Sequence, residues 1–256
     1  MTAGDEDAPV PWRGGETWTA ALADLVVPVE CAGCGRPRHR WCPDCAATLA
    51  GAPLGVRTRA ELRVPVWALS RHAGPAARAV SAYKDRGRAD LARPLGAALA
   101  AAVDVLRADG EIAEAGDRPT VLVPAPASAR ARRRRGFDHV RGVVDVLAAE
   151  LAGSVPGGPV VVAPLLEVRG RVRDAAGLGA QARADNLSGR IRRRPVGTGL
   201  RATPGAPATV PALLGTPSTV LLVDDVVTTG ATAAQCVAVL DAGGLRVTGV
   251  LAVTAA

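Results

Sequence analysis

Residues 220–232 read Val-Leu-Leu-Val-Asp-Asp-Val-Val-Thr-Thr-Gly-Ala-Thr, and this stretch decides the fold that we expect. Its first residues are uncharged and aliphatic, which is typical of a strand buried in a parallel sheet. Two carboxylates, Asp224 and Asp225, end the strand. A Thr-Thr-Gly turn follows, and helical spacing begins at Ala231 and stops at Gly243-Gly244. We therefore predict a strand, a loop and a helix, the unit of an α/β domain with a parallel sheet.

The loop between this strand and helix has the chemistry of a sugar-phosphate site. A helix N-terminus presents unpaired N–H groups and the positive end of the helix dipole, so it favours an anion. Gly230 lets the backbone approach a phosphate closely, and the three threonines of the loop add hydroxyl donors. Asp224 and Asp225 suit acceptors for a vicinal diol such as the ribose 2′- and 3′-hydroxyls, or an indirect hold on a metal ion. A ligand with both groups is a ribose 5-phosphate.

Two other interpretations of the stretch stay open. A hydrophobic strand that ends in Asp-Asp is also typical of the Walker B strand of ATPases, but the chain contains no G-x-x-x-x-G-K-[ST] phosphate loop. Alternatively, the carboxylates only end a strand, and Thr-Thr-Gly is an ordinary turn.

Composition and charge indicate the class of protein. The 256 residues allow one or two domains, and the chain is 48% hydrophobic but only 2% aromatic, so we expect a core of Ala, Val and Leu. A net charge of +7 favours polyanionic ligands, either phosphates or nucleic acid. Residues 1–16 are expected to form a disordered tail. Neither a signal peptide nor an 18-residue apolar run is evident, so we expect a cytoplasmic protein without a membrane segment.

Four of the five cysteines form two C-x-x-C pairs within a short stretch. They are Cys31, Cys34, Cys42 and Cys45. Two such knuckles supply the four thiolates of a closed, structural zinc site, so residues 17–60 are predicted to be a zinc ribbon. A disulfide or redox pair is the alternative, which a reducing cytosol disfavours.

A second strand, loop and helix unit is predicted from Thr120 to about Ala152, and its loop, residues 127–136, is strongly basic. This loop suits pyrophosphate or a DNA backbone, unless it is merely solvated. Residues 169–194 are expected to be a mobile basic loop, and residues 195–218 a flexible linker. Lys84 is the only lysine among the 31 basic residues, which hints that an ammonium group is needed there.

Taken together, these motifs resemble the ComF family, a group of type I phosphoribosyltransferase-like proteins known from natural competence for DNA uptake. The resemblance covers roughly residues 17–253 apart from the linker. It rests on the double C-x-x-C ribbon, Tyr83-Lys84-x-x-Gly87-Arg88, Val123-Pro-x-Pro126, Arg135-Gly136-Phe137, Arg183-x-x-Asn186-Leu187 and the Asp224–Thr232 loop. It implies a type I phosphoribosyltransferase fold in residues 61–256, with phosphoribosyl pyrophosphate (PRPP) and Mg²⁺ as ligands.

The resemblance also implies roles for individual residues. Asp224 and Asp225 would take the ribose hydroxyls, and the loop that follows would take the 5′-phosphate. The PRPP-binding candidates are Asp224, Asp225, Val226, Thr228, Thr229, Gly230, Ala231 and Thr232. The candidates for the pyrophosphate loop and for a lid over residues 169–186 are Lys84, Ser128, Arg130, Arg135, Gly136, Arg173 and Arg183.

Two of the departures from the family pattern lie within the motifs. Asp138-His139 stands where the family usually has Asn-Gln, and Ala175 stands where a lid glutamine is expected. His139 is interpreted as a surface residue, with a base beside the pyrophosphate loop as the alternative.

Three functions remain open from the sequence. The first is binding of PRPP or ribose 5-phosphate with transfer of the phosphoribosyl group to an unknown acceptor. The second is an accessory role in DNA uptake or recombination, through contacts with single-stranded DNA or a helicase. The third is sensing of PRPP without turnover.

Overall fold

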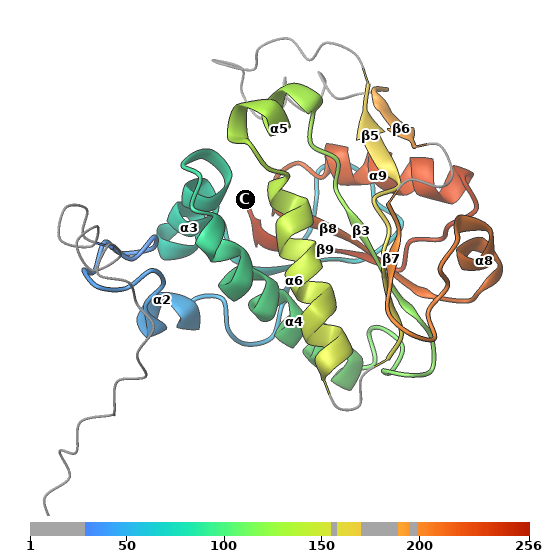
Figure 1. Ribbon diagram of the computed structural model, residues 1–256, viewed down its shortest axis with the longest axis horizontal. Coiled ribbons are helices and arrows are strands. Elements are labelled where there is room, and N and C mark those ends of the chain that lie inside the picture. Colours follow the sequence, from blue (N-terminus) through green and yellow to red (C-terminus); the bar gives the residue numbers. More distant parts are fainter. Residues whose placement is uncertain (1–28, 155–157, 170–188, 195–198) are drawn as a thin grey trace, which may run out of the picture.

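The computed structural model of the protein describes residues 29–154, 158–169, 189–194 and 199–256. At its centre lies a seven-stranded sheet, and a separate pair of strands lies beside it (Figure 1). From edge to edge, the strands of the large sheet are β1 (Leu54–Gly55), β2 (Val66–Arg71), β9 (Gly249–Ala255), β8 (Thr219–Val227), β3 (Thr120–Pro124), β4 (Val160–Val162) and β7 (Arg201–Ala202). The pair consists of β5 (Leu166–Val168) and β6 (Ile191–Arg193), which run antiparallel.

The five inner strands of the large sheet are parallel, and only the short edge strands β1 and β7 run antiparallel to their neighbours. From β3 the chain moves outward to β4, then returns to the other side of β3 to form β8 and β9. The direction of winding therefore reverses between β3 and β8. In open α/β sheets, ligands bind at such a switch point, outside the carboxyl ends of the strands.

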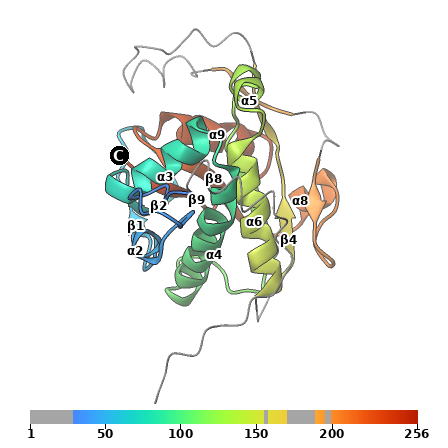
Figure 2. The ribbon, with the colours of Figure 1, turned by 60° about the vertical axis from the view of Figure 1, so that its left-hand side comes forward.

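Helices cover both faces of the sheet (Figures 1 and 2). They are α2 (Pro43–Ala47), α3 (Gly74–Asp85), α4 (Ala92–Ala108), α5 (Ala129–Arg135), α6 (His139–Gly153), α8 (Val210–Gly215) and α9 (Ala231–Ala242), and a 3₁₀ turn (Ala89–Leu91) precedes α4. The apolar residues of α3, α4 and α6 pack on one face, and those of α8 and α9 pack on the other. The predicted α/β architecture with a parallel sheet is thus confirmed.

Alternation along β8 explains how one strand serves two cores. Leu221 and Val223 face the α3, α4 and α6 layer, whereas Val220 and Leu222 face α9. Successive side chains of a strand point to opposite faces of its sheet, so an uninterrupted aliphatic run fits a strand that is covered on both sides. The core contains mainly Ala, Val and Leu, as the composition predicts.

Two predictions about loops are wrong. The expected linker over 195–218 contains β7 and α8 in its described part, and Leu213 of α8 is fully buried against the α9 layer. The expected basic loop contains α5, because Ser128 caps the helix by accepting a hydrogen bond from the Ala131 N–H, and Gly136 ends it at φ 79°. Among the described residues, no helix is long and apolar enough to cross a membrane.

The contact between α4 and α6 depends on a glycine. A Cβ atom built on Gly96 of α4 would lie 2.6 Å from Cβ of Val146 on α6. Small residues at a helix crossing allow the backbones to approach, and added volume there forces the helices apart. The two helices form the layer that holds one wall of the candidate site described below.

We expect Gly96→Ala to destabilise the protein by about 1–3 kcal/mol, because the added methyl group overpacks the crossing. Thermal unfolding measures this as a lower Tm. Gly153→Ala, at the end of α6, is the matched control, since a Cβ there meets nothing within 4 Å. Alanine is also the better helix former, so the control is expected to keep or slightly raise Tm. Equal Tm values for the two variants would contradict the packing argument.

Candidate functional site

A cavity of about 560 Å³ lies at the carboxyl ends of the parallel strands. Residues 125–128 line it after β3, and residues 224–233 line it at the end of β8 and the start of α9. These are the two strands at which the winding reverses, so the cavity occupies the position that the topology favours for a ligand. All eight residues predicted to bind PRPP line this cavity, as do Lys84, Ser128 and Arg135.

The loop after β8 leads into the N-terminus of a helix, as predicted. Helix α9 begins at Ala231 as expected, and Gly230 precedes it with φ 80°. A side chain at Gly230 would be strained by this φ and would also lie 2.6 Å from Cβ of Thr58. The Ala60 N–H donates to the Thr229 carbonyl at 2.9 Å, so the segment around Thr58 supports the loop from behind. Strand β8 extends to Val227, two residues beyond the predicted end.

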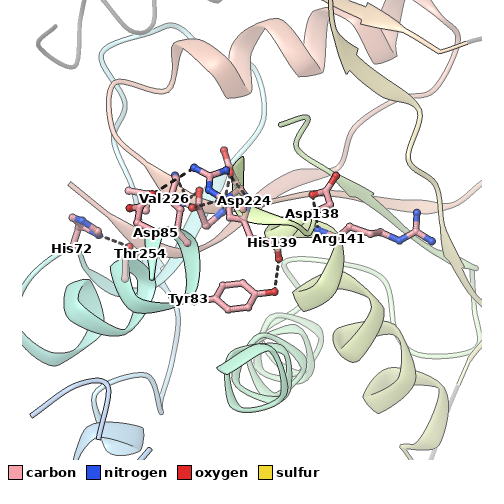
Figure 3. A network of polar contacts seen from close by, with 12 residues as sticks. His72, Tyr83, Asp85, Asp138, His139, Arg141, Asp224, Val226 and Thr254 are labelled. Carbon is pink, nitrogen blue, oxygen red and sulfur yellow. Dashed lines mark hydrogen bonds and ion pairs between the residues drawn. The ribbon is translucent and has the colours of Figure 1, made fainter. Parts of the chain in front are cut away.

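Asp225 is the centre of a buried polar network. Figure 3 shows the surroundings of this network, with His139, Tyr83 and Asp224 labelled. Its Oδ2 atom lies 2.7 Å from Nζ of Lys84 and 3.1 Å from Nε2 of His139, and its Oδ1 accepts the Val226 N–H at 2.9 Å. The residue is only 8% exposed. A carboxylate so far from water needs such partners, because an unpaired buried charge is costly.

The two neighbouring carboxylates have opposite pKa shifts. Burial alone would raise the pKa of Asp225, but the charge of Lys84 and the hydrogen bond from His139 lower it below its usual range. Burial and the nearby charge of Asp225 raise the pKa of Asp224 well above its usual range. Burial would lower the pKa of Lys84, yet the charge of Asp225 raises it. Asp225 and Lys84 are therefore a stable ion pair, whereas ionised Asp224 is unfavourable in the folded protein.

Helix α3 contributes both Lys84 and Tyr83 to this network. Tyr83 is 2% exposed, and its Oη donates to the His139 carbonyl at 2.6 Å. Its ring packs against Phe137, with centroids 5.5 Å apart. Burial raises the pKa of Tyr83, so its hydroxyl stays a donor. The structure thus gives the single lysine a specific role, as its rarity in the sequence hinted.

Helix α5 brings Arg135 to the cavity beside the end of α3, where its Nη2 lies 3.6 Å from Oδ1 of Asp85. The Arg135 side chain is 10% exposed, and its Nη1 lies 3.4 Å from Nδ1 of His139. Its Nε is buried and has no hydrogen-bond partner among the described residues. Because Arg135 lines the cavity, its guanidinium is a cation that an anionic ligand can contact there.

The remaining predicted residues are placed as follows. Gly136 ends α5 and does not line the cavity. The side chain of Arg130 and the lid candidates Arg173 and Arg183 lie outside the described residues. The interpretation of His139 as a surface residue is wrong, because it is 3% exposed. Its position at the start of α6 suggested exposure, but α3, α5 and β8 all converge on that helix end.

Sequence reasoning missed three contributors to the site. The sequence indicates Tyr83 only as part of the motif that contains Lys84, although it is the single tyrosine of the chain. His72 lines the cavity beyond β2, with its Nδ1 at 2.8 Å from Oγ1 of Thr254. The segment that contains Thr58 carries no pattern that would predict its contact with Gly230. Tyr83 could have been found from its rarity in a chain with few aromatic residues.

The four predicted zinc ligands also come together. The sulfur atoms of Cys31, Cys34, Cys42 and Cys45 all lie within 4.8 Å of one another, and none forms a disulfide. Four thiolates at about 2.3 Å from a zinc ion would lie about 3.8 Å apart, so the cluster fits a tetrahedral metal site. A Cβ on Gly33 would lie 2.6 Å from the Cys45 sulfur, which explains the glycine in the first knuckle. The cluster is confirmed, and the identity of the metal stays a prediction.

The segment around Cys31–Cys45, called the cysteine module below, is hydrogen-bonded to α3 and to the turn that follows it. The Arg78 Nε donates to the Gly33 carbonyl, and Arg88 donates to the carbonyls of Glu30 and Arg40, each at 3.1 Å. Burial alone would raise the pKa of Cys31, but hydrogen bonds from the Cys42, Cys34 and Gly33 backbones lower it to about 6. Its thiolate is the form that binds metal.

Comparisons with known proteins do not identify this chain. No protein-family model matches it, and no curated protein matches it by sequence. The residues of the site itself therefore carry any inference about function.

The opposite pKa shifts predict opposite effects of two conservative substitutions. The pKa of Asp224 is higher in the folded protein than the value near 3.8 expected in the unfolded chain, so folding favours the protonated carboxyl. This contribution to the free energy of unfolding is present below pH 3.8 and is lost as pH rises through the folded pKa. Asp224→Asn removes the cost of ionising this buried carboxyl, so we expect the variant to have a higher Tm than the wild type at pH 8. Each 1 kcal/mol of added unfolding free energy should raise Tm by about 2–4 °C. The Tm difference between variant and wild type should shrink toward pH 4.

Asp225→Asn is the matched control for this experiment. Because the pKa of Asp225 is lowered, its contribution is complete above the unfolded value near 3.8 and is lost only as pH falls through the folded value. We expect a lower Tm that differs from the wild type by a constant amount between pH 5 and 8. A pH-independent effect of Asp224→Asn would contradict the assignment.

We expect about one zinc ion per purified chain, measured by metal analysis. Cys42→Ser should abolish it and lower Tm, because three thiolates no longer close the site. Cys236→Ala, which removes the buried cysteine of α9, is the control and should keep the metal. Metal-free wild-type protein with an unchanged Tm would show that the cluster binds no structural ion.

Proposed function

We propose that this protein binds PRPP, or another ribose 5-phosphate, in the cavity between β3 and β8. The observation that carries the proposal is a cavity at the switch point of the sheet that is lined by a helix N-terminus, two adjacent carboxylates and the cation Arg135. A ligand with two anionic groups separated by a diol matches these three features. The resemblance of the motifs to the ComF family supports the same ligand.

The 5′-phosphate is assigned to the start of α9. This helix has 12 residues, so its N-terminal N–H groups carry a substantial partial positive charge. Gly230 has no side chain to block the approach, and the hydroxyls of Thr228 and Thr232 line the same part of the cavity. No lysine or arginine lies in this loop, so the phosphate would be held by N–H and O–H donors alone.

The ribose hydroxyls are assigned to the carboxylates. Asp225 already receives three hydrogen-bond donors, whereas Asp224 accepts the Asp225 N–H at 2.8 Å. Donors from a diol would stabilise the ionised form of Asp224, which is unfavourable in the ligand-free protein. Ligand binding would thereby relieve an electrostatic cost that the folded protein carries.

The pyrophosphate is assigned to Arg135, the last residue of α5. Its guanidinium could bind phosphate oxygens through two N–H groups at once. Mg²⁺ would accompany the pyrophosphate and reduce its charge; Asp224 and Asp225 are the carboxylates near enough to hold the ion through water. Ser128 caps α5 and keeps this short helix beside the cavity.

This arrangement also supports transfer of the phosphoribosyl group. The bond between C1 and the pyrophosphate oxygen would break with its electron pair on pyrophosphate, and an acceptor amine or base would bond to C1 and lose a proton. Arg135 would offset the charge that develops on the leaving group. The acceptor is unassigned.

A second candidate function is an accessory role in DNA uptake. It is favoured by exposed arginines on α5 and on the cysteine module, among them Arg133, Arg134, Arg38 and Arg40. Single-stranded DNA or a helicase partner would bind this surface. Such contacts with DNA phosphates weaken steeply as salt increases.

Calorimetric titration with Mg²⁺ and PRPP tests the proposal. We expect micromolar binding to the wild type and a loss of about tenfold or more for Arg135→Leu, because a charge-assisted hydrogen bond contributes about 1.5–3 kcal/mol. Arg133→Leu is the control, since it removes the same charge from an exposed position of the same helix. The double variant Asp224→Asn, Asp225→Asn should also lose binding.

Equal losses in Arg133→Leu and Arg135→Leu would mean that only the net charge of α5 matters. No heat with PRPP, together with salt-dependent binding of single-stranded DNA, would favour the accessory role. Binding of PRPP without pyrophosphate release in the presence of amines and bases would indicate a sensor.

A further inference from the structure

His139 lies between the two halves of the candidate site (Figure 3). On one side its Nε2 is 3.1 Å from Oδ2 of Asp225, and on the other its Nδ1 is 3.4 Å from Nη1 of Arg135. Its backbone carbonyl accepts the Tyr83 hydroxyl at 2.6 Å. The ring is thus held at both nitrogens and at its backbone, and it is almost completely buried.

These contacts select one form of the ring. Asp225 is ionised beside Lys84 and can only accept, so Nε2 of His139 must carry the hydrogen. The guanidinium of Arg135 can only donate, so Nδ1 must offer its lone pair. A protonated ring would turn Nδ1–H toward Arg135 and place two positive charges side by side. The two hydrogen bonds of the ring therefore fit the neutral Nε2–H tautomer.

The geometry points to His139 as a positioning residue that couples the pyrophosphate half of the site to the ribose half. It would do so as the neutral Nε2–H tautomer, donating to Asp225 and accepting from Arg135. This inference rests on the proposed function for the identity of the ligands. The hydrogen-bonded chain itself, from Arg135 through His139 and Asp225 to Lys84, is a property of the ligand-free protein.

Coupling follows because both ligand groups act on one chain of hydrogen bonds. An anion at Arg135 would hold its guanidinium against Nδ1, which fixes the ring and therefore the carboxylate of Asp225. A ribose that then binds finds this carboxylate already ordered and loses less conformational entropy. By linkage, ribose binding must favour pyrophosphate by the same factor.

The tautomer is tested first, on the ligand-free wild-type protein. The ¹⁵N chemical shifts of the histidine rings distinguish Nε2–H from Nδ1–H, and the chain has three histidines, assignable by single substitutions of His39 and His72. His39 is an internal reference of opposite kind, because its Nδ1 lies 2.9 Å from the Pro37 carbonyl and must donate to it. An Nδ1–H tautomer or a charged ring at His139 at pH 8 would overturn the inference.

Coupling is tested by titrating ribose 5-phosphate in the absence and presence of saturating Mg²⁺ and inorganic pyrophosphate. The ratio of the two affinities is compared among the wild type, His139→Gln and His139→Leu, so that direct repulsion between the two anions cancels. The Gln side chain has one donor and one acceptor and can replace both ring nitrogens, whereas Leu has neither. We expect the ratio to fall by about fivefold or more in His139→Leu and to stay within about twofold of the wild type in His139→Gln.

The outcomes separate this inference from the proposed function. If both ligands bind and the ratio is the same in all three proteins, His139 has no coupling role and the proposed function stands. If neither ligand binds the wild type, the proposed function fails and with it the coupling, while the tautomer measurement still decides the hydrogen-bonded chain. If His139→Leu does not fold, a loss of coupling in His139→Gln would also overturn the inference.

Discussion

The buried charge of Asp225 is the constraint on which the rest of the site depends. A carboxylate at the end of a covered strand is tolerable only if fixed donors surround it, and these come from three elements: Lys84 from α3, His139 from α6 and the Val226 N–H from β8. The two helices must therefore meet at the carboxyl edge of the sheet. The hydroxyl of Tyr83 joins them directly, because it donates from α3 to the first residue of α6.

The cysteine module also helps to hold α3, the helix that carries Lys84, in place. Arginines at both ends of the Lys84 region, Arg78 and Arg88, bond to backbone carbonyls of the module. Trp41 and Leu49 also pack against the same core as α3 and α4. Because a small metal module has little core of its own, these contacts fix it to the sheet domain and fix α3 in return. The module thus has a structural connection to the cavity without contributing a side chain to it.

The sequence predicts what depends on neighbouring residues and misses what depends on packing. The strand at 220, the loop at Gly230, the start of α9 and the cysteine cluster each have a local pattern, and the structure contains all of them. The burial of His139 has no local signal, because three separate elements cover it. Likewise the arginine run is predicted to be a loop because it lies between a strand and a helix, yet Ser128 and Gly136 cap it as a helix. Lys84 is only partly predictable. Its rarity in the sequence hints at a role, but only the fold shows that it pairs with Asp225.

The two adjacent aspartates look equivalent in the sequence, but the strand places their side chains in different environments. Val223 faces the α3 and α6 layer, so alternation directs Asp225 to that side and Asp224 toward α9. Asp225 contacts Lys84 and His139 there, whereas Asp224 lines the cavity. Burial and the charge of Asp224 raise the pKa of Cys236 on α9. Fixed donors therefore stabilise the charged form of Asp225, whereas Asp224 has fewer donors. Adjacent acids whose pKa values shift in opposite directions are more common at functional sites than elsewhere.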